Sequence, residues 1–205
     1  MDWAVFSAFV VASFILSVAP GPDNLFVLVQ SATYGARAGL WVVAGLLTGL
    51  VVQTLLVALG VAAIVAASPM LFWAIKIVGA CYLVYLAVMA WRAGSTEEGR
   101  TLDTTSALVL WRRGVIMNIT NPKVLIFFLA FFPQFLVQAS DIPVVVQMIV
   151  LGVTFMATTA VVFGGVALGA GVLADKLRTP RVQFFLNKTA AVIFVGLAVG
   201  TLVGA

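Results

Sequence analysis

The 205-residue sequence contains no histidine, one cysteine and few charged residues, which make up 9% of the chain. With Cys81 as its only thiol, the chain cannot form an intrachain disulfide, and soft metal sites have almost no ligands. We therefore predict neither a metal nor another cofactor. The lack of histidine and of a dispersed pair of acids also argues against an enzyme. The phosphate loop G-x-x-x-x-G-K-[ST] of an ATP-driven pump is absent from the sequence as well.

Apolar residues dominate instead, at 63% of the chain with a mean hydropathy of +1.20. Soluble proteins are about half apolar and about a quarter charged, so this composition predicts an integral membrane protein that contacts the lipid bilayer. The formal net charge of +4 then reports orientation in the membrane. A nucleic-acid partner is not expected, because the sequence lacks a clustered basic face with interleaved aromatic residues.

Six apolar stretches are long enough to cross the bilayer, which takes about 20 residues. The first includes "WAVFSAFVVASFILSVA", which lacks the basic start of a secretion signal and is expected to be retained as a span. We predict one all-α transmembrane domain over residues 1–205, with one helix triplet at about 1–95, a cytoplasmic loop at about 93–112 and a second triplet at about 113–205. The predicted spans are residues 3–33, 39–67, 69–92, 114–137, 143–173 and 183–204.

Basic residues gather in the loops on one side of this arrangement. The opposite side has Asp2 and Asp141 but no lysine or arginine. Because positively charged loops stay in the cytoplasm, both termini are predicted to lie outside. The basic loop residues are Arg37, Arg92, Arg100, Arg112, Arg113, Lys176, Arg178 and Arg181.

Two triplets of spans must cross the membrane in opposite senses, because three is an odd number. This is the inverted-repeat layout of many secondary transporters. The first span of each triplet is interrupted by proline, at "APGPDN" (19–24) and at "NPK" (121–123). The last span of each triplet opens with a lysine, Lys76 or Lys188, and continues into a similar apolar tail. The paired prolines are the stronger indication of a repeat.

Each proline interruption frees backbone carbonyl groups near the middle of a predicted span, namely those of Leu16, Val18 and Asn118. A carbonyl without a partner is costly in hydrocarbon, so the broken segments must face protein or a water-filled cavity. Each break also begins a half-helix whose unpaired N–H groups suit a carboxylate, while the freed carbonyls and Asp23 suit an ammonium group. Together the two breaks predict a midplane site for a zwitterion.

Asp23 and Lys123 are the most costly residues at this depth, at about 2.5–3.5 kcal/mol each if unpaired. In one interpretation Lys123 meets a substrate carboxylate and Asp23, in a chain without histidine, is the proton-coupling group. In the other they pair with each other, or Asp23 caps its half-helix and Lys123 extends towards the cytoplasm. Lys76 is open to either a functional or an interfacial role.

Asn118 and Asn121 lie three residues apart, where their amides can cap the break or contact substrate. In the last span, Gly196, Gly200 and Gly204 allow close helix packing, either within one chain or in a homodimer. The predicted substrate-binding residues are Pro20, Gly21, Pro22, Asp23, Asn24, Asn118, Asn121, Pro122 and Lys123, with Lys76 as a further candidate.

Three stretches of the sequence resemble the LysE/RhtB family of bacterial amino-acid exporters. They are "APGPDNLFVLVQSATYGARAGL", "IKIVGACYLVYLA" and "RGVIMNITNPKVLIFFLAFFPQF". Their order and spacing also fit, so the resemblance covers essentially the whole chain, and the N-x-x-N-P-K pattern is its most specific part. The chain departs from the family pattern at Ala87, Ala190 and Ala191, where a glycine is common, and these departures concern packing.

The resemblance implies export of amino acids or close derivatives from the cytoplasm across the bacterial inner membrane, driven by the proton gradient. It leaves the substrate open, because similar proteins serve basic, small hydroxylated, branched-chain or sulfur-containing amino acids. A single midplane acid favours a neutral zwitterion over a dibasic substrate. The alternatives are a channel-like facilitator and an exporter of another small metabolite.

Overall fold

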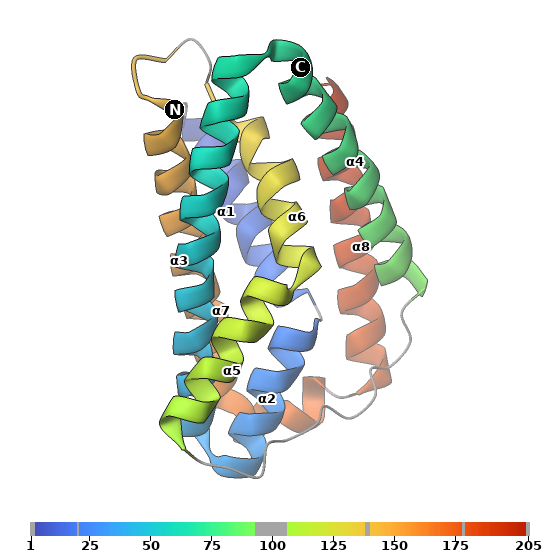
Figure 1. Cartoon of the computed structure of the whole chain (residues 1–205). Helices are drawn as coiled ribbons and strands as arrows, with labels where there is room; N and C mark the ends of the chain where they lie inside the picture. The colour runs from blue at the N-terminus through green and yellow to red at the C-terminus, as the bar shows by residue number, and fades with distance from the viewer. Residues whose placement is uncertain (1–2, 20, 93–105, 138–139, 178, 204–205) are drawn as a thin grey trace.

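The computed structural model describes residues 3–19, 21–92, 106–137, 140–177 and 179–203, and these residues form helices without any strand (Figure 1). The prediction of an all-α chain is confirmed over this part of the sequence. The elements are α1 (Trp3–Val18), α2 (Pro22–Tyr34), α3 (Ala36–Ala67), α4 (Pro69–Arg92), α5 (Ala107–Thr120), α6 (Pro122–Phe131), the short 3₁₀ helix η1 (Phe132–Phe135), α7 (Val144–Leu177) and α8 (Pro180–Val203).

Two of these helices can cross a membrane by length and hydropathy, over Ala36–Val61 in α3 and Val144–Ala170 in α7. The pair α1 and α2 would add a third as one broken span, with a bend of 58° between the two helices. Large apolar side chains face outward, such as Leu56 with 65% and Val161 with 70% of its surface exposed. An outer surface of this kind suits lipid.

The helix boundaries follow the predicted spans closely except at α5, which begins at Ala107 instead of near residue 114. Leu110 is fully buried in this extra part, and the indole Nε1 of Trp111 donates to the hydroxyl of Thr48 at 3.2 Å. Contacts with α3 therefore extend the helix into the stretch predicted to be a polar loop.

Glycine brings α3 and α5 together at backbone distance. A methyl group at Gly114 would overlap the carbonyl oxygen of Val42, and one at Gly45 would overlap that of Trp111. Only glycine at both positions allows this approach. In the last helix the space around Gly196 is open, while the surroundings of Gly200 and all of Gly204 lie outside the described residues.

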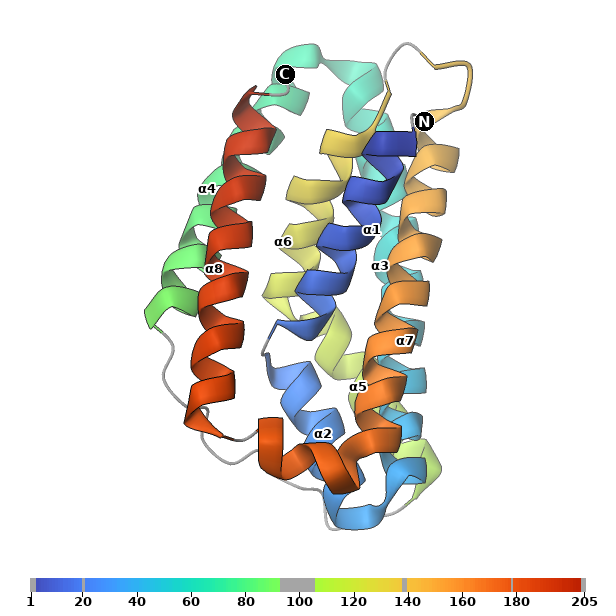
Figure 2. The ribbon, with the colours of Figure 1, turned by 180° about the vertical axis from the view of Figure 1, so that it is seen from behind.

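Helices α4 and α8 run side by side along one flank of the bundle (Figures 1 and 2). Lys188 in α8 links the two helices through Trp91 in α4. Its ammonium donates to the Trp91 carbonyl at 2.6 Å and lies 3.8 Å from the centre of the Trp91 ring. A cation over an indole ring at this distance is attractive.

Most of the buried apolar core belongs to two clusters, centred on opposite halves of the bundle. The first, which we call the aromatic cluster, joins α1, α6, η1 and the first half of α7 with parts of α3, α4 and α8. The second, the aliphatic cluster, joins α2, α5 and the neighbouring parts of α3 and α7. Both helix interruptions lie between them (Figure 2). The aromatic cluster includes Phe9, Phe127, Phe128, Phe131, Phe132 and Phe155, and the aliphatic cluster Phe26, Val27, Val42, Val43, Leu46, Leu110 and Phe163.

Candidate functional site

The first interruption separates α1 from α2. Helix α1 ends at Val18, Gly21 is extended, and α2 begins with Pro22, which has no N–H to lose at a helix start. The side-chain amide of Asn24 reaches back to the carbonyl groups at the end of α1. Its distances are 2.8 Å to Ser17, 3.3 Å to Val18 and 3.2 Å to Ala19. Asn24 therefore caps the end of the helix that precedes its own.

The second interruption separates α5 from α6 at Asn121, again just before a proline. The carbonyl of Asn118 accepts the backbone N–H of Asn121 at 3.1 Å. It also accepts the side-chain amide of Gln53 in α3, at 3.0 Å. The prediction that the Val18 and Asn118 carbonyls are freed is thus confirmed, because each accepts a side-chain amide, from Asn24 and from Gln53. The same prediction for the Leu16 carbonyl rests on Pro20, which lies outside the described residues.

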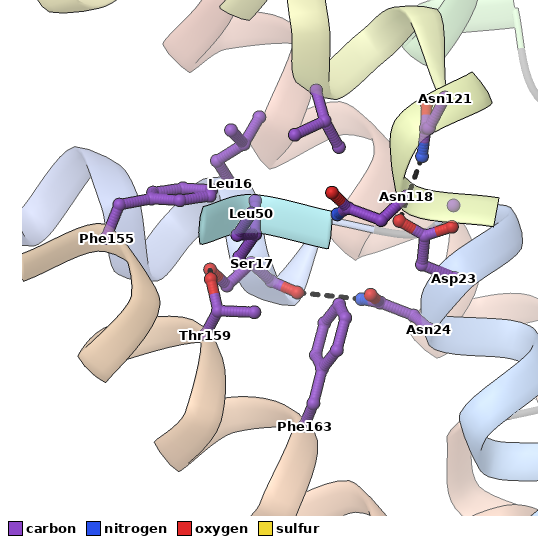
Figure 3. A pocket seen from close by; sticks show the side chains of 12 residues that line it. Leu16, Ser17, Asp23, Asn24, Leu50, Asn118, Asn121, Phe155, Thr159 and Phe163 are labelled. Carbon is purple, nitrogen blue, oxygen red and sulfur yellow. Dashed lines mark hydrogen bonds between the residues drawn. The ribbon is translucent and has the colours of Figure 1, made fainter. Parts of the chain in front are cut away.

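The two interruptions meet through one buried hydrogen bond. The amide nitrogen of Asn121 donates to Oδ2 of Asp23 at 2.9 Å, and each residue has 7% of its surface exposed (Figure 3). A hydrogen bond to a charged group is among the stronger ones in proteins, and burial makes it harder to exchange for water. This bond ties the start of α2 to the start of α6.

A small cavity of about 40 Å³ lies at this junction. A volume of this size has room for about three water molecules, but not for an amino acid. The cavity would therefore have to widen to hold an amino acid. The lining residues are Leu16, Ser17, Gly21, Asp23, Asn24, Leu50, Asn118, Asn121, Val124, Phe155, Thr159 and Phe163.

The cavity has groups for both poles of a zwitterion. Asp23 contributes a carboxylate, and Oδ1 of Asn118 is buried without a hydrogen-bond partner among the described residues. Both favour a group that donates hydrogen bonds, such as an ammonium. Gly21 and Asn121, which precede α2 and α6, also line the cavity. Helix starts carry a partial positive charge that favours a carboxylate.

Five of the predicted site residues share this cavity: Gly21, Asp23, Asn24, Asn118 and Asn121. Pro22 is exposed and begins α2 without lining it. Pro20 lies outside the described residues, as do the side chains of Lys76, Pro122 and Lys123. The predicted alternatives for Lys123 therefore stay predictions.

Several lining residues were not predicted from the sequence. Ser17 and Thr159 give no signal, because hydroxyl side chains are common in apolar helices and bond to their own backbone. Gln53 does not line the cavity, but its amide donates to the Asn118 carbonyl at the second break. The sequence gives a usable signal for it, since an amide in the middle of the apolar stretch "VVQTLL" is as unexpected as Asn118. The apolar lining residues give no signal either, because in the sequence they resemble the other residues of their apolar stretches. They are Leu16, Leu50, Phe155 and Phe163.

Comparison with known proteins then assigns the family. The sequence matches the LysE type translocators over residues 14–204. The chain belongs to this family. The LysE type translocators are membrane transport proteins, and the resemblance found in the sequence is confirmed.

Among its relatives, a membrane protein of Vibrio cholerae is 34% identical over 198 residues, which cover 96% of this chain and 95% of the relative. A homoserine/homoserine lactone efflux protein of Salmonella typhimurium is 33% identical over 189 residues, covering 92% and 91%. A leucine efflux protein of Salmonella choleraesuis is 32% identical over 130 residues, covering 62% and 61%. No solved structure matches the chain.

Proposed function

We propose that this translocator exports amino acids or close derivatives across the bacterial inner membrane, as a proton-coupled secondary transporter and not as an enzyme. The observation that carries the proposal is the bond between Asp23 and Asn121, which joins two interrupted helices at a buried polar cavity. Relatives named as efflux proteins for homoserine and leucine support the substrate class. Each name includes a neutral amino acid, homoserine or leucine, in agreement with a single buried acid at the site.

The proposed architecture is six spans arranged as two inverted triplets. It is supported by two interrupted helix pairs, α1 with α2 and α5 with α6, in each of which the second helix begins at a proline. Each pair is followed by one long helix and one further helix, and the long helices α3 and α7 pack against each other, as do α4 and α8. This order is the one that inverted repeats produce.

The proposed orientation puts both termini outside. The start of α1 and the end of α8 lie at the same end of the bundle (Figure 2). Described arginines lie towards the other end, in the first turn of α3, the last of α4, the middle of α5 and the first of α8. The positive-inside rule makes that end cytoplasmic. The arginines are Arg37, Arg92, Arg112, Arg113 and Arg181.

The proposed mechanism is alternating access. The cavity at the interruptions lies between the aromatic cluster and the aliphatic cluster, so each cluster can act as a closed gate on one side. A substrate zwitterion would place its ammonium near Asp23 and its carboxylate near the starts of α2 and α6. Asp23 would release its proton towards the cytoplasm when the substrate binds. Outside, a new proton on Asp23 would weaken its hold on the ammonium and release the substrate.

The test is transport by inverted membrane vesicles that contain the full chain. In such vesicles export appears as uptake, and an acidic interior supplies the proton gradient. We expect labelled neutral amino acids to accumulate only when the gradient is present. Uptake that reaches the same level without a gradient would favour the channel-like facilitator. Uptake of none of a panel of neutral, basic and acidic amino acids would overturn the proposal and favour another small metabolite.

A further inference from the structure

A pair of hydroxyl groups lies on the side of the cavity away from Asp23 and Asn121 (Figure 3). Oγ of Ser17 in α1 and Oγ1 of Thr159 in α7 are 3.2 Å apart, and each residue has only 4% of its surface exposed. The pair joins residues 142 positions apart in the sequence. It is therefore part of the tertiary structure of the site and not a local helix feature.

The direction of the hydrogen bonds within the pair can be deduced. The hydroxyl of Ser17 donates its only proton to the carbonyl of Ser13, at 2.8 Å. The proton between the two hydroxyls must then come from Thr159, because a hydroxyl has one proton and two acceptor sites. The Thr159 oxygen keeps free acceptor capacity on the cavity, so the pair can accept a hydrogen bond from a bound molecule.

The other groups on this side of the cavity are apolar. They are Leu16, Leu50, Phe155 and Phe163. The polar residue Asn24 also lines the cavity, but its amide donates to the carbonyls at the end of α1. No acid among the described lining residues other than Asp23 could balance a second positive charge. Asp23 and the hydroxyl pair line the same cavity, so the part of a substrate that reaches from one to the other is short. The chemistry of this side thus fits a short, uncharged chain that ends in a hydrogen-bond donor.

We propose that Ser17 and Thr159 form the side-chain subsite of this transporter and select amino acids with a short hydroxylated side chain. This inference rests on the proposed export function and names its substrate class. The substrate hydroxyl donates to Oγ1 of Thr159, while the ammonium stays near Asp23. An aliphatic side chain of the same length would leave the buried Thr159 oxygen without a donor, and such unpaired groups are what make a polar subsite selective.

The experiment compares homoserine with norvaline, in which a methyl group replaces the hydroxyl. Uptake of each labelled compound is measured in inverted vesicles with an acidic interior, for the full chain and for Thr159→Val, which makes the same exchange in the protein. We expect the wild type to prefer homoserine and Thr159→Val to lower the homoserine/norvaline ratio roughly fivefold or more. Thr159→Ser, which keeps the hydroxyl, should retain the preference.

Thr158→Val is the matched control. The Thr158 hydroxyl donates to the carbonyls of Thr154 and Phe155 in its own helix and does not line the cavity, so the ratio should not change. A second readout uses the wild type alone: unlabelled norvaline should inhibit homoserine uptake only at a concentration at least about fivefold higher than unlabelled homoserine. This readout does not depend on the folding of any variant.

The outcomes separate the subsite from the export function. Equal inhibition by the two compounds, or an unchanged ratio in Thr159→Val, would overturn the subsite while export of both compounds supports the proposed function. Uptake of no amino acid by the wild type would overturn the export function and the subsite with it. A lowered ratio in Thr159→Val alone among the three variants supports the subsite.

Discussion

The break between α1 and α2 is closed from within its own segment, whereas the break between α5 and α6 is closed partly by another helix. Asn24 lies between five and seven residues from the carbonyls that it caps. Gln53 lies 65 residues from the Asn118 carbonyl that it caps. The first break can therefore keep its shape as α1 and α2 move together, while the second depends on how α3 packs against α5.

Because of this difference, we expect the two breaks to respond differently when helices move during transport. The bond from Asn121 to Asp23 joins them directly, at the point where the proposed substrate and proton meet. A movement of α3 would reach the second break through Gln53 and through Gly49, where an added methyl group would overlap the side chain of Asn118. The movement would then pass to the first break through the hydrogen bond from Asn121 to Asp23. Substitutions that weaken each support separately test this difference.

The largest effect is expected from Gly114→Ala. The added methyl group would overlap backbone atoms of Val42 and Leu46, which cannot move aside as a flexible side chain can. We expect a loss of about 3 kcal/mol of stability, measured by titrating the detergent-solubilised protein with sodium dodecyl sulfate and following tryptophan fluorescence.

The matched control for this substitution is Gly164→Ala in α7, where nothing lies within reach of the added methyl group. Alanine favours a helix over glycine, so this variant should be up to about 1 kcal/mol more stable than the wild type. Equal effects of the two alanines would mean that close contact between α3 and α5 does not hold the second break.

Asn24→Leu should have the next largest effect. The substitution removes the amide that caps the carbonyls of Ser17, Val18 and Ala19. Buried acceptors left without donors cost about 1–3 kcal/mol, so we expect a loss of about 2 kcal/mol in the same titration. The control is Thr154→Val, whose exposed hydroxyl donates only to its own helix. A loss no greater than that of the control would show that water or another group caps the first break.

Gln53→Leu should have the smallest effect of the three. It removes one donor to the Asn118 carbonyl, but the backbone N–H of Asn121 still serves that oxygen. The substitution also removes the Gln53 oxygen, which is buried without a partner among the described residues. We expect a loss of about 1 kcal/mol. A loss larger than that of Asn24→Leu would reverse the comparison and make the second break the more dependent on its cap.

The sequence was sufficient to predict those features that depend on local chemistry. Proline cannot continue a helix that precedes it, so Pro22 and Pro122 located both interruptions. Apolar runs located the helices for the same reason, because an uninterrupted apolar stretch has to be buried or to face lipid. The breaks also single out Asp23 and Asn121 from the sequence alone.

The remaining features depend on how distant helices assemble. The pairing of Ser17 with Thr159 and of Gln53 with Asn118 requires the packing of α3 and α7 against the broken helices, which hydropathy does not specify. The early start of α5 depends on assembly too, since burial of Leu110 against other helices stabilises that turn. Neither hydropathy nor proline position carries this information.

In the proposed mechanism, Asp23 couples protons to export at the joined breaks. Gradient-driven uptake of a labelled amino acid can be compared in inverted vesicles that contain Asp23→Asn or the wild type in equal amounts. Asn121 can still form a hydrogen bond to the new side chain, and Asp141→Asn, at an exposed position, serves as the control. We expect accumulation by Asp23→Asn to fall to the level of vesicles without the protein, while Asp141→Asn behaves as the wild type does. Accumulation by Asp23→Asn that still follows the proton gradient at the wild-type rate would show that Asp23 is not the proton-coupling group.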